Sequence, residues 1–289
     1  MGKLSQALEK SSSTGRQSTT PVPPVPPERP EAAAQLKTAP ASTVDNKPGA
    51  TSTLFSQDRW DQRLLLSTNP RSPFFETFRR LRTPILYPAS GNLPKTILVT
   101  SVAANEGKGF VCANLGIALA QGMENYALML DCDLRRPSLA QLFGLPNDAG
   151  LVDHLQDHID LSLLIRKTGQ AKLSLIPSGK PPRNPSELLD SSRMVALINE
   201  LAERYQDRII LFDSPPNIIA SETTILAKHV DGVILVVRYG ASKREQVKKF
   251  VDTIGPDKVL GLVFNAYPDN TMTAFLDKKM GYDYGEYHS

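Results

Sequence analysis

The chain has 289 residues, of which 40% are hydrophobic and 22% are charged, and its formal net charge is +3. This length and composition suit one sizeable folded domain with additional segments. The weak net charge does not by itself call for nucleic acid or a membrane surface as a partner. No apolar run is long enough to span a membrane, and residues 1–10 lack the apolar core of a secretory signal.

Two cysteines, Cys112 and Cys132, lie in apolar stretches of the sequence. Free thiols in such contexts are typical of small core side chains in a reducing compartment. We therefore predict a cytoplasmic protein in which neither cysteine forms a disulfide.

The first part of the chain has the composition of a leader and a linker. Residues 1–10 carry Leu4, Ala7 and Leu8 on one side, which predicts a short amphipathic helix. Residues 11–69 are rich in Pro, Ala, Ser and Thr. Such a composition buries too little apolar surface to fold, so we predict a disordered, extended linker.

Residues 70–280 are predicted to form the folded domain. The segment 72–87 reads as a helix that carries Glu76, Arg79 and Arg82 on one face, because they are spaced three residues apart. Apolar runs then alternate with helical segments. The expected strands are 96–102, 126–134, 172–177, 208–213, 232–238 and 259–265, and the expected helices are 107–122, 138–144, 150–157, 192–205, 221–229 and 242–254. This alternation predicts an α/β fold, with a mostly parallel twisted sheet flanked by helices on both faces.

The segment 102–109, "VAANEGKG", joins the first strand to the helix that follows it. A phosphate loop of the usual kind reads G-x-x-x-x-G-K-[ST]. Gly107 and Lys108 match this pattern, whereas Val102 and Gly109 replace the first glycine and the closing hydroxyl residue. Backbone N–H groups at such a turn bind phosphate, and Lys108 would reach the β- and γ-phosphates. By itself the pattern fits an ordinary strand-to-helix turn equally well.

Carboxylates follow two further strands. Asp131 and Asp133 end the second strand, with Arg135 behind them, and Asp213 ends a later one. The carboxyl ends of central parallel strands line the crevice where ligands bind. We expect Asp213 to hold magnesium directly or through water, and Asp131 and Asp133 to hold the metal and polarise an attacking hydroxyl. Solvated strand ends are the alternative, which the neighbouring Gly-Lys turn disfavours.

Together these motifs resemble the bacterial tyrosine kinases (BY-kinases), which belong to the deviant phosphate-loop ATPases. The resemblance covers most of residues 70–289 and includes the Asn-Pro-x-Glu-Leu-Leu segment at 184–189 and the switch-helix segment at 221–240. It implies an ATP- and Mg²⁺-dependent kinase of exopolysaccharide or capsule assembly. The nucleotide-binding residues that it implies are Asn105, Glu106, Gly107, Lys108, Gly109, Phe110, Arg135 and Asn265, the last of these contacting the base. The catalytic residues that it implies are Lys108, Asp131, Asp133 and Asp213, the three aspartates also holding the metal.

The resemblance also implies how the kinase assembles and what it modifies. Glu76, Arg79 and Arg82 satisfy the family's E-x-x-R-x-x-R pattern, which implies a homo-oligomeric ring. Residues 281–289 form a tail whose Tyr282, Tyr284 and Tyr287 are the implied autophosphorylation sites, modified in trans within the ring.

The implied partners are a membrane-embedded polysaccharide co-polymerase (chain-length) protein and a cognate tyrosine phosphatase. The co-polymerase would be a separate polypeptide that activates the kinase and recruits it peripherally to the inner membrane. No nucleic-acid partner is expected.

The phosphate loop departs from the family pattern at three positions. Val102 replaces a small residue, and Asn105 replaces a glycine where a positive φ is expected. Gly109 removes a magnesium ligand, so a water would have to replace it. On this basis Gly109→Ser is expected to tighten MgATP binding. The loss of the hydroxyl keeps a second hypothesis open, a nucleotide-binding pseudokinase that serves as a regulatory subunit. A third hypothesis, a partition-type ATPase, has less support, because Ala103 stands where those proteins carry a second lysine.

Overall fold

The computed structural model describes residues 56–88, 91–217 and 222–266. Residues 1–10, most of the predicted linker and the whole tail 281–289 lie outside the described residues. The described strands are β1 (Thr96–Ser101), β2 (Tyr126–Asp131), β3 (Arg166–Lys167), β4 (Leu173–Ile176), β5 (Arg208–Asp213), β6 (Gly232–Arg238) and β7 (Val259–Asn265). The described helices are α1 (Gln62–Leu65), α2 (Pro73–Leu86), α3 (Lys108–Ala120), α4 (Leu139–Leu142), α5 (Leu151–Asp157), α6 (Leu161–Leu164), α7 (Pro185–Leu189), α8 (Ser192–Arg204), α9 (Glu222–His229) and α10 (Arg244–Ile254).

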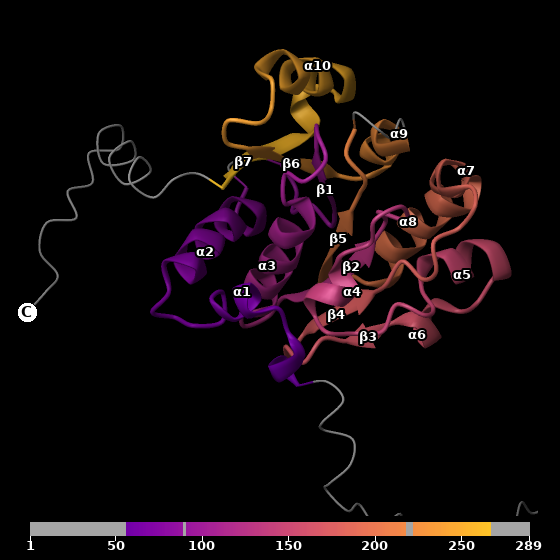
Figure 1. Cartoon of the computed structure of the whole chain (residues 1–289), viewed down its shortest axis with the longest axis horizontal. Helices are drawn as coiled ribbons and strands as arrows, with labels where there is room; N and C mark the ends of the chain where they lie inside the picture. Colours follow the sequence, from indigo (N-terminus) through magenta and orange to yellow (C-terminus); the bar gives the residue numbers. More distant parts are fainter. Residues whose placement is uncertain (1–55, 89–90, 218–221, 267–289) are drawn as a thin grey trace, which may run out of the picture. The chain divides into compact units, whose positions relative to one another are not determined.

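The strands form one seven-stranded sheet in the order β3-β4-β2-β5-β1-β6-β7. Every neighbouring pair is parallel except β3–β4, which is antiparallel at one edge. The predicted fold class is therefore confirmed (Figure 1). The sequence analysis did not predict β3, because two residues are too few to show a periodic pattern.

Two hydrophobic clusters cover the two faces of the sheet. Alternate residues of the central strands enter different clusters: Leu98 of β1 packs with α5–α10, while Ile97 and Val99 pack with α1–α4. Helix α3 is buried along nearly its whole length, which explains why its sequence is apolar on all sides. Burial on both faces accounts for the continuous apolar runs of β1, β5 and β6.

The predicted linker extends too far toward the folded domain. Its last residues, 56–69, include helix α1, and they pack on the same cluster as α3. Trp60 is 4% exposed, donates a 2.7 Å hydrogen bond from Nε1 to the carbonyl oxygen of Thr168, and meets Phe143 edge-on at 4.9 Å. Leu64 is completely buried. The domain therefore begins by residue 56, because these few apolar side chains find partners that are distant in sequence.

Helix α2 carries the predicted oligomerisation residues, and the structure gives them different surroundings. Glu76 and Arg79 are about half exposed and form an ion pair of 3.1 Å on their own helix. Arg82 instead donates a 2.6 Å hydrogen bond from Nη1 to the carbonyl oxygen of Ala118, in the last turn of α3. Arg82 therefore has a structural role within the domain, whereas Glu76 and Arg79 present their side chains to solvent.

Candidate functional site

The carboxyl ends of β1, β2 and β5 meet at one edge of the sheet, and the predicted site lies there (Figure 1). Asp131 of β2 is paired in register with Asp213 of β5, which is in turn paired with Val99 of β1. The strand register thus brings together carboxylates that lie 82 positions apart in the sequence (213 − 131). The loop 102–107 leaves β1 at the same edge and leads into α3.

Two residues of this loop adopt the left-handed backbone conformation. Asn105 has a φ of 61° and Gly107 a φ of 87°, so the positive φ predicted at position 105 is present. Asparagine tolerates this conformation better than most residues. Glu106 is buried beneath the loop, where its carboxylate accepts a 3.0 Å hydrogen bond from the amide of Ala103 and contacts the hydroxyl of Ser242. These contacts fix the path of the loop.

The N-terminus of α3 is arranged to receive an anion. Gly107 occupies the N-cap position and offers no side chain to the first amides of the helix. Unpaired amides at a helix N-terminus carry partial positive charge and bind phosphate groups. The ammonium of Lys108, the first helical residue, lies 2.7 Å from a carboxylate oxygen of Asp133. Burial opposes this charge, but Asp213 and Asp133 outweigh it and raise the pKa of Lys108 above its ordinary value.

Asp213 is the unusual group of the site. Its side chain is completely buried, and neither carboxylate oxygen receives a hydrogen bond of ordinary geometry. Burial raises the pKa of Asp213 well above its ordinary value, against the opposing effects of Lys108 and of the nearby Ser138 hydroxyl. Buried polar atoms without partners are rare and call for an explanation. A hydrated magnesium ion would supply one, because Mg²⁺ binds carboxylate oxygens and keeps several waters.

Asp131 and Asp133 are already engaged by the protein. One oxygen of Asp131 accepts hydrogen bonds of 2.9 Å from the amides of Ser138 and Leu139, and the other accepts one of 3.2 Å from the amide of Asp133. Burial raises the pKa of Asp131 to about 7, while the two amides lower it. Asp133 accepts from the amide of Arg136 and pairs with Lys108. In the described residues no three His, Cys, Asp or Glu side chains are grouped to hold a metal by themselves.

A cavity of about 460 Å³ opens over the loop and the start of α3. Its loop residues 105–110, with Asp133 and Arg135, were predicted from the sequence, whereas Asp61 and Arg63 also line it and were assigned to the linker. The guanidinium of Arg63 lies 5.5 Å from the centre of the Phe110 ring and is paired with Asp61 at 2.8 Å. The other lining residues that the sequence analysis did not single out for the site are Ala104, Arg136, Ser138, Gln141, Leu142 and Pro216.

Two predicted nucleotide-binding residues have protein partners in the structure. Arg135 donates hydrogen bonds to Ser186 at 2.6 Å and to the buried Glu222 at 3.2 Å while lining the cavity. Asn265 donates from its side-chain nitrogen to the carbonyl oxygen of Glu106 at 2.8 Å, so it braces the phosphate loop. Its contact with a nucleotide base stays a prediction.

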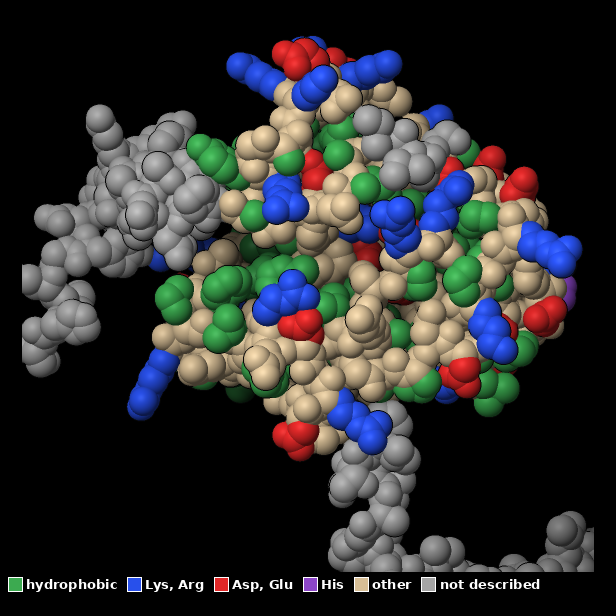
Figure 2. Space-filling view, in the orientation of Figure 1, with side chains coloured by type: hydrophobic (Ala, Val, Ile, Leu, Met, Phe, Trp, Pro, Cys, Tyr) green, Lys and Arg blue, Asp and Glu red, His purple; other side chains and the backbone are tan. Residues whose placement is uncertain are grey.

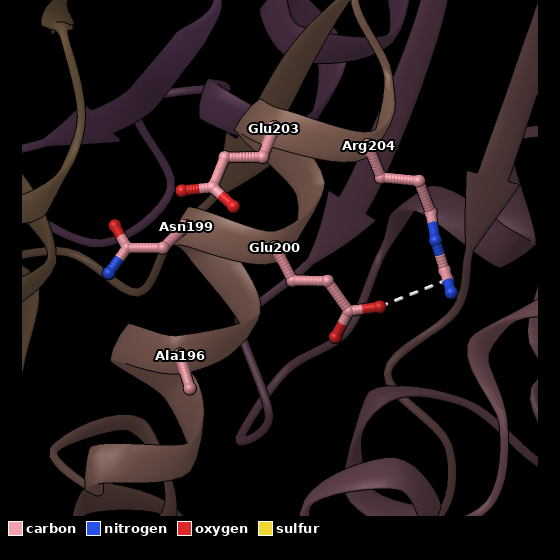
Figure 3. Close-up of a pocket in the computed structure, with 5 residues that line it drawn as sticks. All are labelled: Ala196, Asn199, Glu200, Glu203 and Arg204. Atoms are coloured by element: carbon pink, nitrogen blue, oxygen red, sulfur yellow. Dashed lines mark ion pairs between the residues drawn. The ribbon is translucent and has the colours of Figure 1, made fainter.

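Another hollow, of about 670 Å³, lies along the exposed side of α8. Its polar side chains include Glu200 and Arg204, which pair with one another at 3.0 Å (Figure 3). The side chains of this hollow all come from successive turns of one helix, and they are Ala196, Asn199, Glu200, Glu203 and Arg204. No loop or strand end contributes to it, so we place the functional site at α3 although the hollow at α8 is larger.

On the face shown in Figure 2, Lys and Arg side chains are interspersed with Asp and Glu side chains. Within residues 56–88, 91–217 and 222–266, none of the helices combines the length and the apolar character that crossing a bilayer requires. Cys112 and Cys132 are free and completely buried, and burial raises the pKa of each thiol, which agrees with their predicted role as core side chains.

Comparisons with known proteins converge on one kind of protein. No protein-family model matches the chain. The chain is 31% identical over 209 residues to the tyrosine-protein kinase YwqD of Bacillus subtilis (strain 168), and this alignment covers 72% of the chain and 87% of YwqD. Among solved structures, the chimeric protein CapA2B2 is 32% identical with a TM-score of 0.65, over 75% of this chain and 94% of that one. The kinase domain of the Escherichia coli tyrosine kinase ETK is 27% identical with a TM-score of 0.66, over 77% and 84% of the two chains.

Proposed function

The chain belongs to the bacterial tyrosine kinases, and from this premise we propose that it is an MgATP-dependent autokinase that phosphorylates the tyrosines of its own C-terminal tail. One observation supports this activity above the others. The carboxylate of Asp213 is buried and receives no hydrogen bond of ordinary geometry, although the Ser138 hydroxyl lies near it, beside the uncapped N-terminus of α3. A phosphate group would give the first amides of α3 a partner, and a magnesium ion would give the carboxylate of Asp213 one.

Different residues of the site bind the phosphates and the metal during phosphoryl transfer. The amides at the start of α3 and the ammonium of Lys108 hold the β- and γ-phosphates, so Lys108 exchanges its ion pair with Asp133 for one with phosphate. Asp213 holds the hydrated metal. When bound, Mg²⁺ neutralises charge on the β- and γ-phosphate oxygens. Positioning and charge stabilisation account for most of the catalysis of this reaction.

We assign to Asp133 the role of receiving the proton of the attacking tyrosine. It lines the cavity and is paired with Lys108. If Lys108 turns to the phosphate, the carboxylate oxygen that it now contacts becomes available to the tyrosine. In the transfer step the phenolic oxygen bonds to the γ-phosphorus, and the bond from that phosphorus to the bridging oxygen breaks. ADP leaves with the electron pair of this bond, and Asp133 orients the hydroxyl and accepts its proton.

The cellular role follows from the family. We place this kinase in the control of exopolysaccharide or capsule polymerisation or export, as a peripheral inner-membrane protein activated by a membrane-embedded co-polymerase. In this account Glu76 and Arg79 form part of the contact that closes a homo-oligomeric ring, and each tail reaches a neighbouring site. Phosphates on Tyr282, Tyr284 and Tyr287 add about −1.5 to −2 charges each, which loosens the ring by repulsion. A tyrosine phosphatase restores the unmodified state.

A phosphotyrosine immunoblot after incubation with MgATP and the cytoplasmic segment of the co-polymerase tests the activity. We expect signal from the wild type, no signal from Lys108→Ala, and unchanged signal from Lys248→Ala, which removes an exposed lysine on α10. A signal that persists in Lys108→Ala would assign the phosphorylation to a contaminating kinase.

Gly109 supports a second candidate, a pseudokinase that binds nucleotide and acts as a regulatory subunit. Residue 109 provides no hydroxyl to a metal. The two candidates separate in the same experiment, since a pseudokinase binds ADP at the α3 site and gives no phosphotyrosine even with the co-polymerase segment present.

A further inference from the structure

Gly109 has a specific neighbour in the space where its side chain would lie. A β-carbon built on this residue overlaps the hydroxyl oxygen of Ser138 and lies 3.0 Å from a carboxylate oxygen of Asp213. Gly109 is the position at which a phosphate loop usually carries its metal-binding hydroxyl. A hydroxyl from another part of the chain therefore occupies the volume that the lost one would need.

The backbone of Ser138 is fixed by the neighbouring strand end. Its amide donates a 2.9 Å hydrogen bond to the carboxylate of Asp131, and the amide of Leu139 donates to the same oxygen. Asp131 thus holds the turn that carries Ser138 against the site. This gives Asp131 a positioning function that its burial and its engaged oxygens support better than direct metal binding.

The hydroxyl of Ser138 is not used to cap its own helix. Serine at an N-cap position commonly accepts a hydrogen bond from an amide of the first turn. Ser138 occupies the N-cap of α4 without such a bond. Its side chain turns instead toward Gly109 and Asp213, and the residue lines the same cavity as Lys108.

We propose that Ser138 supplies, from the α4 side, the hydroxyl ligand for magnesium that position 109 lacks. The inference rests on the proposed function and names a residue of the same site. A serine hydroxyl oxygen is a hard, neutral ligand of the kind that the usual loop provides, and magnesium accepts it beside a carboxylate, phosphate oxygens and waters. Gly109 then completes the arrangement, since only a residue without a β-carbon leaves room for the Ser138 hydroxyl.

On this proposal, Gly109→Ser alone should not tighten MgATP binding, which differs from the expectation drawn from the sequence. A serine at 109 would displace the hydroxyl of Ser138, so one ligand replaces another and the crowded Asp213 must shift. A serine at 109 should support MgATP binding only when the Ser138 hydroxyl is removed from the space that it occupies. In Gly109→Ser with Ser138→Ala the overlap is gone, and contacts of 3.0 Å to Asp213 and 3.4 Å to the β-carbon at 138 remain to adjust.

Calorimetric titration of ADP with and without Mg²⁺ tests the proposal on the full chain. For each protein the quantity of interest is the factor by which Mg²⁺ tightens ADP binding. We expect Ser138→Ala to reduce this factor about tenfold, as loss of a metal-site partner commonly does, while leaving metal-free ADP binding unchanged. Ser138→Thr keeps the hydroxyl and should keep most of the factor. Gly109→Ser with Ser138→Ala should regain it, and Gly109→Ser alone should not exceed the wild type.

The outcomes separate this inference from the proposed function. If Mg²⁺ tightens ADP binding equally in the wild type and in Ser138→Ala, the inference is wrong and the kinase assignment stands. The inference is also wrong if Ser138→Ala and Ser138→Thr reduce this factor equally and the double variant does not recover it. That result would assign Ser138 a packing role. If the wild type binds no ADP with or without Mg²⁺, the proposed function and the inference both fail.

Discussion

The side chain of Asn265 lies where a β-carbon on Gly107 would be, and it donates a 2.8 Å hydrogen bond to the carbonyl oxygen of Glu106. The end of β7 thus supports the phosphate loop from behind. Position 107 requires glycine for two separate reasons, its φ of 87° and the lack of space beside Asn265.

Gly107→Ala should therefore disrupt nucleotide binding. Overpacking against Asn265 costs about 1–3 kcal/mol, and an energy of this size lost from the bound conformation corresponds to about 5–150-fold in affinity. Gly91→Ala is the matched control, because Gly91 has a φ of 86° with open space around it. That variant should lose about 1 kcal/mol of stability to backbone strain and keep its affinity for ADP with Mg²⁺. Equal affinities in the two variants would remove Asn265 from the account of this loop.

The folded domain should depend on residues that the sequence analysis placed in a linker. Leu64→Ala deletes a completely buried side chain and should lower the free energy of unfolding by about 2–5 kcal/mol. Leu66→Ala removes a side chain that is 43% exposed, and it should cost no more than about 0.5 kcal/mol. Urea denaturation of both variants makes the comparison. Two equal, small changes would mean that residues 56–69 do not pack on the domain in solution.

Different residues of helix α2 should support ring assembly and domain stability: Glu76 and Arg79 the assembly, and Arg82 the stability. Glu76→Ala with Arg79→Ala should reduce ring assembly in light scattering with little change in the unfolding temperature, since both side chains are about half exposed and pair with each other on their own helix. Arg82→Ala removes a charged hydrogen bond to the end of α3, and it should cost about 1.5–3 kcal/mol of stability.

The control for assembly is the exposed pair Lys248→Ala with Asp252→Ala on α10, which also removes one charge of each sign. If this control pair reduces assembly as much as Glu76→Ala with Arg79→Ala does, general surface charge explains the effect and α2 has no special contact.

The tail should carry most of the phosphotyrosine. Replacing Tyr282, Tyr284 and Tyr287 with phenylalanine should abolish most of the signal, because the proposed reaction in trans brings a tail tyrosine next to the phosphate in a neighbouring site. Tyr87→Phe with Tyr239→Phe is the control, since these side chains are 77% and 49% exposed within the domain. Mass spectrometry of phosphopeptides reads the result. Phosphate found mainly on Tyr87 or Tyr239 would contradict the tail as the substrate.

The sequence was sufficient to predict most of the sheet and the centre of the site. Strands buried on both faces show as continuous apolar runs, so β1, β2, β5 and β6 could be identified. Because parallel strands end at one edge, the sequence alone predicts that Lys108, Asp131, Asp133 and Asp213 lie together.

Other features depend on contacts that no local pattern shows. Trp60 and Leu64 follow a Pro-rich stretch, and their burial depends on α3, Phe143 and Thr168. The role of Ser138 depends on the space beside Gly109, which lies 29 positions earlier (138 − 109). A serine placed directly after the "DCDLRRP" segment was the signal available in the sequence, but only the fold brings its hydroxyl to the site.

Transfer between two marked subunits tests the central claim most directly. One protein, Lys108→Ala, keeps its tail tyrosines and has no activity of its own. The other keeps Lys108 and carries Tyr282, Tyr284 and Tyr287 as phenylalanine. After the two are mixed with MgATP and the co-polymerase segment, phosphopeptide mass spectrometry should find phosphate on the tail of the Lys108→Ala protein. No phosphate on that tail, while the wild type phosphorylates itself under the same conditions, would contradict tail phosphorylation in trans.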